Sequence, residues 1–235
     1  MRIAGLQKLT LLDFPGTVAC TVFTGGCNFR CPFCHNAALV LPERQAEDMP
    51  VEELLRFLKS RRGLLEGVAI TGGEPLLHAD MPDLLRTIRA MGYAIKLDTN
   101  GSFPQRLEAL IAERLVDRVA MDVKNSPALY AVTAGTPVDL DAIERSKALL
   151  LEGRVDYEFR TTVVKGLHTR ESLREAAMWI RGAREYYLQQ YRDTGNVIDP
   201  NGLGAFDAEE MNALRDAVAE ILPCVRLRGV DEKKG

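Results

Sequence analysis

The chain has 235 residues, of which 46% are hydrophobic, and this is enough apolar material for one sizeable core. No apolar run approaches the ~20 residues that a membrane-spanning helix requires. Residues 1–8 lack the apolar block of a secretory signal, so a cytoplasmic protein without a membrane partner is expected. The formal net charge is −3 with dispersed basic residues, which argues against a nucleic-acid partner.

Apolar stretches alternate with amphipathic helical patterns along most of the chain. Residues 17–23 predict a buried strand, and residues 50–61 predict a helix with Leu54 and Leu58 on its apolar face. Further strands are expected at 67–71, 93–98, 116–123, 157–164 and 184–191, with a short extended piece at 225–228. Further helices are expected at 80–91, 104–114, 139–152, 171–181 and 207–221, the third of them capped by Asp139. The C-terminal residues 231–235 are expected to be frayed.

This order of elements predicts an α/β fold with a parallel sheet and right-handed crossovers. Six strand–helix units fit this length, whereas a complete eight-unit barrel takes about 250 residues. A partial (βα)6 TIM-like barrel is therefore the predicted fold, and an open flavodoxin-like sheet is the alternative. No linker or internal repeat divides the chain, so residues 1–235 are expected to form one domain.

Each predicted strand ends in residues that a hydrophobic core does not need. Turn chemistry alone explains any single Gly-Gly or Asn-Gly motif. In parallel α/β architectures, however, ligands bind at the carboxyl ends of the strands, so several such motifs at one edge indicate one site. After the first strand comes a cysteine-rich loop, and the later strands end in Thr-Gly-Gly-Glu-Pro (71–75), Asp-Thr-Asn-Gly (98–101), Met-Asp-Val-Lys (121–124), Val-Val-Lys-Gly (163–166) and Gln-Gln-Tyr-Arg (189–192).

Three of the five cysteines fall within eight residues, with the spacing Cys-x3-Cys-x2-Cys at Cys27, Cys31 and Cys34. In a cytosolic chain, clustered cysteines are more often metal ligands or catalytic groups than disulfides. A cubane iron–sulfur cluster usually takes four thiolates. A loop that supplies three would leave one iron without a protein ligand, where a small molecule can bind and be reduced.

Two other metal sites remain open on the spacing alone. Zinc could take the three cysteines together with His35, although the adjacent Cys34 and His35 side chains point apart in an extended segment. A four-cysteine cluster would need Cys20 or Cys224 as its fourth ligand. Both of these are more simply explained as buried free thiols, which behave as small apolar groups.

The string Cys-Pro-Phe-Cys-His-Asn at 31–36, together with the motifs at 71–75, 98–101 and 122–124, resembles the activating enzymes of glycyl radical enzymes. These belong to the radical S-adenosylmethionine (SAM) superfamily, and the resemblance runs from about residue 11 to about residue 191. Within the group, Leu-Asp-Phe-Pro-Gly at 12–16 resembles the anaerobic ribonucleoside-triphosphate reductase activating proteins. The pyruvate formate-lyase activators are similar but usually carry Asp-Gly-Pro-Gly here, so Phe14 departs from them.

The resemblance implies a [4Fe–4S] cluster held by Cys27, Cys31 and Cys34 as the catalytic and metal-binding residues, with SAM chelating the open iron. Glycine in the second motif would let the backbone approach SAM without an intervening Cβ. The implied SAM-binding residues are Phe33, Gly72, Gly73, Glu74, Asp98, Asp122, Lys124, Val164, Gly166 and Arg192. The family often has histidine, as a ribose contact, where this chain has Arg192. A monovalent cation near Asp98, Thr99 and Met121 is also implied.

The resemblance further implies an oxidoreductase that cleaves SAM reductively to methionine and a 5′-deoxyadenosyl radical. This radical would take a hydrogen atom from a glycine Cα of a partner enzyme. The implied partner is a glycyl radical enzyme, and anaerobic ribonucleotide reductase is the preferred candidate. A flavodoxin or ferredoxin-type protein is the implied electron donor. The alternatives are a pyruvate formate-lyase activating enzyme, a radical SAM enzyme acting on a small molecule as the carboxy-deazaguanine synthases do, and a non-catalytic zinc protein.

Overall fold

One curved sheet organises the molecule, and its eight strands follow one another in sequence order. The computed structural model describes residues 1–41, 47–193 and 195–230, so the C-terminal end that we expect to be frayed lies outside it. Strand β1 pairs antiparallel with β2, and β2 to β8 run parallel. The strands are β1 (Ile3–Thr10), β2 (Ala19–Thr24), β3 (Gly67–Gly72), β4 (Ala94–Thr99), β5 (Arg118–Asp122), β6 (Asp156–Val163), β7 (Tyr186–Gln190) and β8 (Val225–Arg228).

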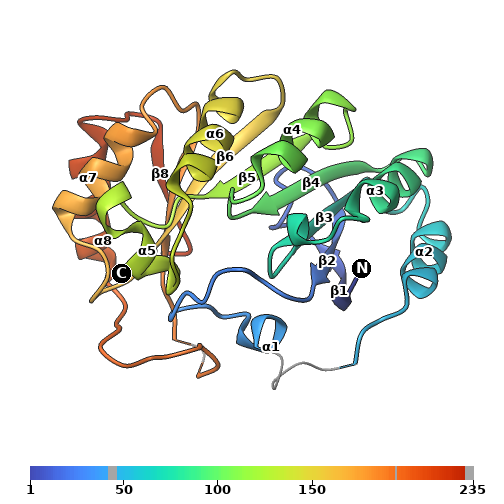
Figure 1. The fold of residues 1–235 in the computed structure, drawn as a ribbon, viewed down its shortest axis with the longest axis horizontal. Coiled ribbons are helices and arrows are strands. Elements are labelled where there is room, and N and C mark those ends of the chain that lie inside the picture. The colour runs from blue at the N-terminus through green and yellow to red at the C-terminus, as the bar shows by residue number, and fades with distance from the viewer. Residues whose placement is uncertain (42–46, 194, 231–235) are drawn as a thin grey trace, which may run out of the picture.

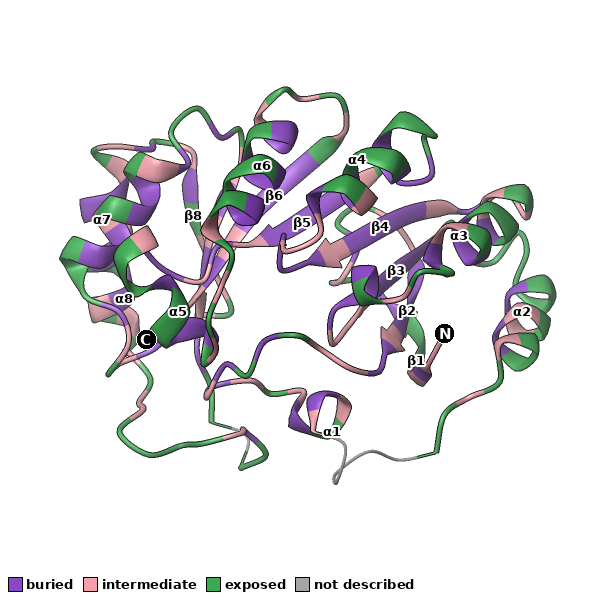
Figure 2. Cartoon of the chain, in the orientation of Figure 1, coloured by how far each residue is buried: buried purple, intermediate pink, exposed green. Residues whose placement is uncertain are grey.

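The longer helices cover the convex outer face of this sheet, and the segment after β2 crosses its concave side (Figure 1). Figure 2 shows that these helices bury the side that faces the sheet and expose the other. The helices are α1 (Ala37–Val40), α2 (Val51–Ser60), α3 (Met81–Ala90), α4 (Pro104–Ala112), α5 (Tyr130–Ala134), α6 (Leu140–Leu151), α7 (Arg170–Trp179) and α8 (Ala208–Ala219). No helix in the described ranges is long and apolar enough to cross a membrane.

The sequential strand order confirms the partial barrel. A flavodoxin-like sheet reverses its strand order at a switch point, and this sheet has no reversal. The expected extended piece at 225–228 forms β8, which pairs with β7. Within the described residues β8 does not pair with β1, so the sheet curves without closing.

The predicted elements are all present, with ends that differ by a few residues. Asp139 caps α6 as expected, because its side chain accepts a hydrogen bond from the Ala142 backbone N–H. Among the strands and α-helices of the described residues, three have no counterpart in the prediction: β1, α1 and α5. Helices α1 and α5 span only four and five residues, too short to show a helical repeat. Strand β1 is half exposed and contains a glycine, so its pattern is weak.

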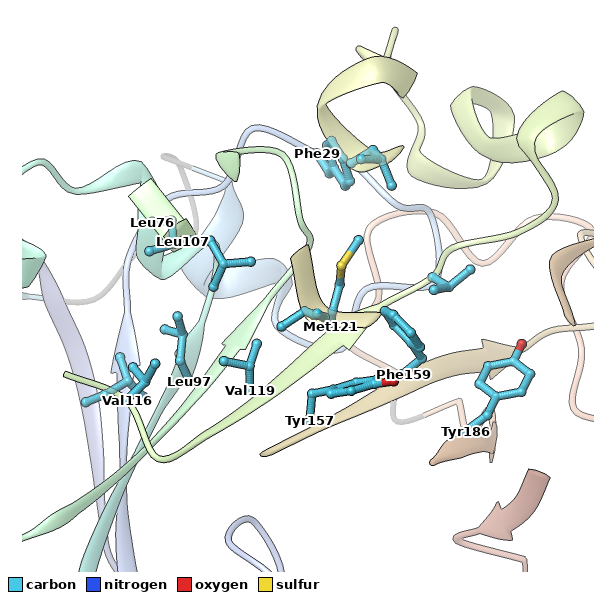
Figure 3. Packing of buried hydrophobic residues seen from close by; sticks show 14 of the residues in the cluster. Phe29, Leu76, Leu97, Leu107, Val116, Val119, Met121, Tyr157, Phe159 and Tyr186 are labelled. Atoms are coloured by element: carbon cyan, nitrogen blue, oxygen red, sulfur yellow. The ribbon is translucent and has the colours of Figure 1, made fainter. Parts of the chain in front are cut away.

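The hydrophobic core lies between the sheet and the outer helices. Leu97 on β4, Val119 and Met121 on β5, and Phe159 on β6 are among the buried residues that form it (Figure 3). Because successive strand residues point to opposite faces, the residues between them face the concave side. These residues include Lys96, Asp98, Arg118, Asp122, Glu158 and Arg160. The interior of a complete barrel is usually packed with branched apolar side chains, whereas this one is charged.

Candidate active site

A cavity of about 250 Å³ opens at the carboxyl ends of the parallel strands. It lies between the cysteine loop, residues 27–34, and the ends of β3 to β7, where parallel α/β architectures bind ligands. The residues that line it are Cys27, Phe29, Cys31, Phe33, Cys34, His35, Asn36, Val40, Thr71, Gly72, Gly73, Asp98, Thr99, Asn100, Asp122, Lys124, Arg160, Thr162 and Gln189.

Most of the site residues expected from the sequence line this cavity. They are Cys27, Cys31, Cys34, Phe33, Gly72, Gly73, Asp98, Asp122 and Lys124. Four others lie elsewhere. The side chain of Val164 is buried in the core, and a Cβ on Gly166 would lie 2.2 Å from the Gly202 carbonyl oxygen. Arg192 Nη2 donates to the Gly229 carbonyl oxygen at 2.8 Å, and Glu74 is fully buried outside the cavity.

Backbone contacts from two distant segments hold the cysteine loop in place. The Arg30 N–H donates to the Ala134 carbonyl oxygen at the end of α5, at 2.9 Å. The Asp199 N–H donates to the Pro32 carbonyl oxygen, also at 2.9 Å. Within the loop, Arg30 Nη1 donates to the carbonyl oxygens of Cys27 and Phe29. These contacts tie the loop to the end of α5 and to the segment around Asp199.

The three loop cysteines are the ones that face the cavity, although the structure describes all five. Burial raises the pKa of Cys27 and of Cys31 to about 11 and raises the pKa of Cys34 as well. These thiols are therefore protonated near neutral pH and release protons when they bind a metal.

The remaining cysteines lie away from the loop. Cys20 is fully buried on β2, and Cys224 Sγ lies 3.2 Å from the Ala183 carbonyl oxygen. Neither lines the cavity, so the four-cysteine alternative has no support. The His35 ring stacks on Tyr191 with centroids 5.4 Å apart. Among the described residues no three ligand-type side chains lie close enough to share one ion, as zinc would require.

A row of alternating charges forms one wall of the cavity. Arg160 on β6 bridges two carboxylates, with Nη1 3.0 Å from Asp98 Oδ2 and Nη2 2.9 Å from Asp122 Oδ1. Lys124 Nζ lies 2.9 Å from Asp122 Oδ2, and Lys96 pairs with Asp98 Oδ1. Burial alone would raise the pKa of Asp122, but the charges of Lys124 and Arg160 outweigh it and hold that pKa below its usual value.

The loop that carries Lys124 is tied to the loop after β6 through a buried histidine. His168 Nδ1 accepts a hydrogen bond from the Val164 N–H at 3.1 Å. Its Nε2 then donates to the Lys124 carbonyl oxygen at 2.8 Å. Burial lowers the pKa of His168, so the ring is neutral and keeps both bonds near neutral pH.

The glycines at 72–73 line the cavity and also allow two backbone segments to approach each other closely. Gly72 has φ +115°, and a Cβ there would lie 2.4 Å from the Thr24 nitrogen. At Gly73 a Cβ would lie 1.8 Å from the Gly26 carbonyl oxygen. Both glycines therefore let the end of β3 pack against the chain that leaves β2 for the cysteine loop.

Glu74 also has a role that the sequence did not reveal. Its Oε1 accepts from the Leu76 N–H and from Thr99 Oγ1, and its Oε2 accepts from the Asn100 N–H. Burial raises the pKa of Glu74 to about 7 despite these donors. Its carboxylate therefore joins the ends of β3 and β4 and does not face the cavity.

The side chains of the three residues near which a monovalent cation is implied all have protein partners. Both oxygens of Asp98 pair with cationic side chains of the protein. Thr99 Oγ1 donates to Glu74 at 2.9 Å. The Met121 side chain is fully buried in the hydrophobic core (Figure 3).

Three residues that line the cavity lie outside every motif that the sequence singled out. They are Val40, Arg160 and Thr162. The clearest missed signal is Arg160, a charged residue inside an otherwise buried strand. Period-two alternation places Thr162 on the same face.

Residues 21–180 match the family model of the radical SAM superfamily. A protein of Methanocaldococcus jannaschii, provisionally named a glycyl-radical enzyme activating enzyme, is 29% identical over 194 residues, covering 80% of this chain and 79% of its own. The pyruvate formate-lyase 1-activating enzyme of Escherichia coli is 32% identical over 130 residues, covering 52% of each chain.

Among solved structures, Streptococcus suis SuiB bound to the precursor peptide SuiA superposes with a TM-score of 0.70 at 16% identity. The superposition covers 89% of this chain and 48% of SuiB. The chain therefore spans about half the length of SuiB and of the E. coli activating enzyme, and about four fifths of the M. jannaschii protein.

Proposed function

The chain belongs to the radical SAM superfamily, whose members use a [4Fe–4S] cluster and SAM, and on this premise we propose that it activates a glycyl radical enzyme. One observation carries the proposal: three of the five cysteines, and no fourth, face a cavity at the carboxyl ends of the parallel strands. A cubane held by three thiolates keeps one iron free for SAM.

The residues present fit this pair of groups. Cys27, Cys31 and Cys34 would hold the cluster, and Asp122 with Lys124 would face the polar groups of SAM across the cavity. Together the bound cluster and SAM supply reductive cleavage of the sulfonium, which yields methionine and a 5′-deoxyadenosyl radical.

The protein's own groups position and shield this chemistry. The three thiols give up their protons on metal binding, and Asn100 Nδ2 lies 3.9 Å from Cys27 Sγ, where it can donate to that sulfur. The buried rings of Phe29 and Phe33 line the cavity and give it an apolar surface. Fixed surroundings that hold the reacting groups in place limit side reactions of a reactive species.

We further propose anaerobic ribonucleotide reductase as the partner, because residues 12–16 resemble the activators of that enzyme. A flavodoxin or ferredoxin-type protein would deliver the electron. The sheet is open, since β1 and β8 of the described residues do not pair, and this supports a macromolecular partner whose peptide loop would enter beside the open edge. The continuous sheet supports one radical SAM domain over residues 1–235, and cytoplasmic location follows from the proposed partner.

The test uses anaerobically reconstituted protein with SAM and dithionite. We expect 5′-deoxyadenosine, and a glycyl radical signal in electron paramagnetic resonance once the reductase is added. If the protein binds about four irons per chain, as one cubane requires, yet forms no 5′-deoxyadenosine, the proposal fails. A radical only on another glycyl radical enzyme would correct the partner. Turnover of a small molecule without any partner would favour the small-molecule alternative.

Two cysteine variants provide a matched pair for the ligand assignment. Cys31→Ala removes a thiol that lines the cavity, so it should lose iron, sulfide and SAM cleavage. Cys20→Ala removes a fully buried thiol outside the cavity, so it should keep all three. A Cys31→Ala protein with an intact cluster would show that the ligand set is wrong.

A further inference from the structure

Lys96 is a buried cation on the concave side of the sheet that the proposed mechanism does not use. Its side chain is only 2% exposed, and it lies outside the cavity, two residues before Asp98 on β4. Burying an ammonium group is unfavourable unless it is paired. The same position in a complete barrel would carry a branched apolar residue. The chain therefore keeps a charge where hydrophobic packing alone would favour an aliphatic side chain.

The ammonium group of Lys96 determines how Asp98 is held. It pairs with Asp98 Oδ1, and this is the one ion pair of Lys96 within the part of the chain that the structure describes. The other oxygen, Asp98 Oδ2, is 3.0 Å from Arg160 Nη1 and accepts a hydrogen bond from Thr71 Oγ1 at 3.2 Å. Both oxygens of a carboxylate that lines the cavity are thus directed by the protein.

The charges around Asp98 alternate along the wall of the cavity. Lys96, Arg160 and Lys124 are cationic, and Asp98 and Asp122 lie between them, so each carboxylate has a cation on either side. Lys96 is the member that does not reach the cavity. It therefore acts on a ligand in the cavity through Asp98, whose carboxylate it holds in place.

We infer that Lys96 is a positioning residue that acts as a built-in monovalent cation. It neutralises the negative charge of Asp98 and orients its carboxylate. SAM therefore binds at this site without an exchangeable ion such as K⁺. A lysine ammonium is a compact point charge on a flexible stem, which suits it to the place of a small cation beside a carboxylate. The inference rests on the proposed function, because it assumes that SAM occupies the cavity.

The test measures SAM binding rather than turnover. In reconstituted Lys96→Met, which removes the charge but keeps the length, the SAM affinity measured by calorimetry should fall about 10- to 100-fold, which is the loss typical when a group that orients a metal-binding side chain is removed. The SAM-induced change in the resonance signal of the reduced cluster should need correspondingly more SAM. Lys96→Ala leaves space beside Asp98, so ammonium or K⁺ should restore its affinity while the larger choline ion does not. Lys96→Arg should retain most of the affinity.

Lys147→Met is the matched control. Lys147 is also nearly buried and pairs with Glu144 at 2.7 Å, but on α6, away from the cavity. It should keep the SAM affinity of the unmodified protein. The inference is overturned if Lys96→Met binds SAM normally, if both variants lose affinity alike, or if choline restores Lys96→Ala as well as K⁺ does. If the unmodified protein itself fails to bind SAM, the proposed function fails instead.

Discussion

Glu74 is one of the residues that the resemblance implies for SAM binding. The structure shows contacts of its carboxylate that this implication does not include. In the folded chain its carboxylate is 0% exposed and accepts three hydrogen bonds from neighbouring loops. The residue therefore affects the site through the position of Thr99 and Asn100, both of which line the cavity.

Replacing this carboxylate by an amide tests that role. In Glu74→Gln the amide NH₂ group, which is a donor, replaces an oxygen that accepted a hydrogen bond. Two donors then face each other, so a buried hydrogen bond is lost. We expect a loss of about 1–3 kcal/mol of stability, measured as a lower thermal midpoint of the reconstituted protein. Glu66 is the control, because it also accepts a backbone N–H, from Val18 at 3.0 Å, but at an exposed position. Equal losses in Glu74→Gln and Glu66→Gln would contradict a special role for burial.

At the scale of elements, α5 is the one that most affects the cysteine loop. This helix spans five residues and ends at Ala134, and Gly135, which has φ +65°, forms its C-cap. Its last carbonyl group accepts the Arg30 N–H. A Cβ at Gly135 would lie 2.1 Å from the Arg30 carbonyl oxygen. The loop therefore rests directly on a backbone that only glycine allows.

A Gly135→Ala variant should push the cysteine loop away from α5 and reduce cluster occupancy. We expect lower iron and sulfide per chain after reconstitution, together with weaker absorbance of the cluster. Gly63→Ala is the control for backbone strain alone. Gly63 has φ +76°, but nothing lies within 4 Å of its Cβ position. This variant should cost about 1 kcal/mol of stability and keep its iron. Full iron content in Gly135→Ala would refute the contact's importance.

At the scale of the whole molecule, a buried ion cluster joins strands that lie far apart in the sequence. Glu158 on β6 is fully buried and contacts Arg118 Nη2 on β5 at 2.9 Å and Arg228 Nη1 on β8 at 2.7 Å. Burial alone would raise the pKa of Glu158, but the two arginines outweigh it and lower that pKa to about 2. The cluster links the sheet to its last strand.

This cluster makes stability depend on pH in a defined window. Glu158 binds its proton less readily in the folded chain, so its contribution is complete above its unfolded pKa of 4.5 and is lost as pH falls towards about 2. The contribution is about 3 kcal/mol.

Glu158→Gln should therefore unfold at a lower temperature than the unmodified protein at pH 7. The difference should shrink as pH falls from 5 towards 3. Comparing the two proteins at each pH cancels the acid sensitivity that they share, including the release of the iron–sulfur cluster. A difference that stays constant over this range would show that the ion cluster does not contribute as described.

The sequence predicted much of the fold because its signals are local. Helical periodicity and β-branched runs located the six strand–helix units, and the Cys-x3-Cys-x2-Cys spacing identified the three cysteines that share the cavity. The short elements β1, α1 and α5 escaped because a segment of four or five residues, or a half-exposed edge strand, has too weak a pattern.

Local sequence determined the cysteine set, the alternation of elements and membership of the superfamily, since each depends on neighbours along the chain. Tertiary structure decided which polar residues meet. Lys96 lies beside Asp98 because residues two positions apart on β4 share a face of the sheet. Arg160 became a partner of Asp98 because β6 lies next to β5 and β5 next to β4, so its long side chain reaches across β5. Alternation along a strand tells which face a side chain occupies. Its partner across the barrel depends on strand register and curvature, which arise only when the whole sheet has formed.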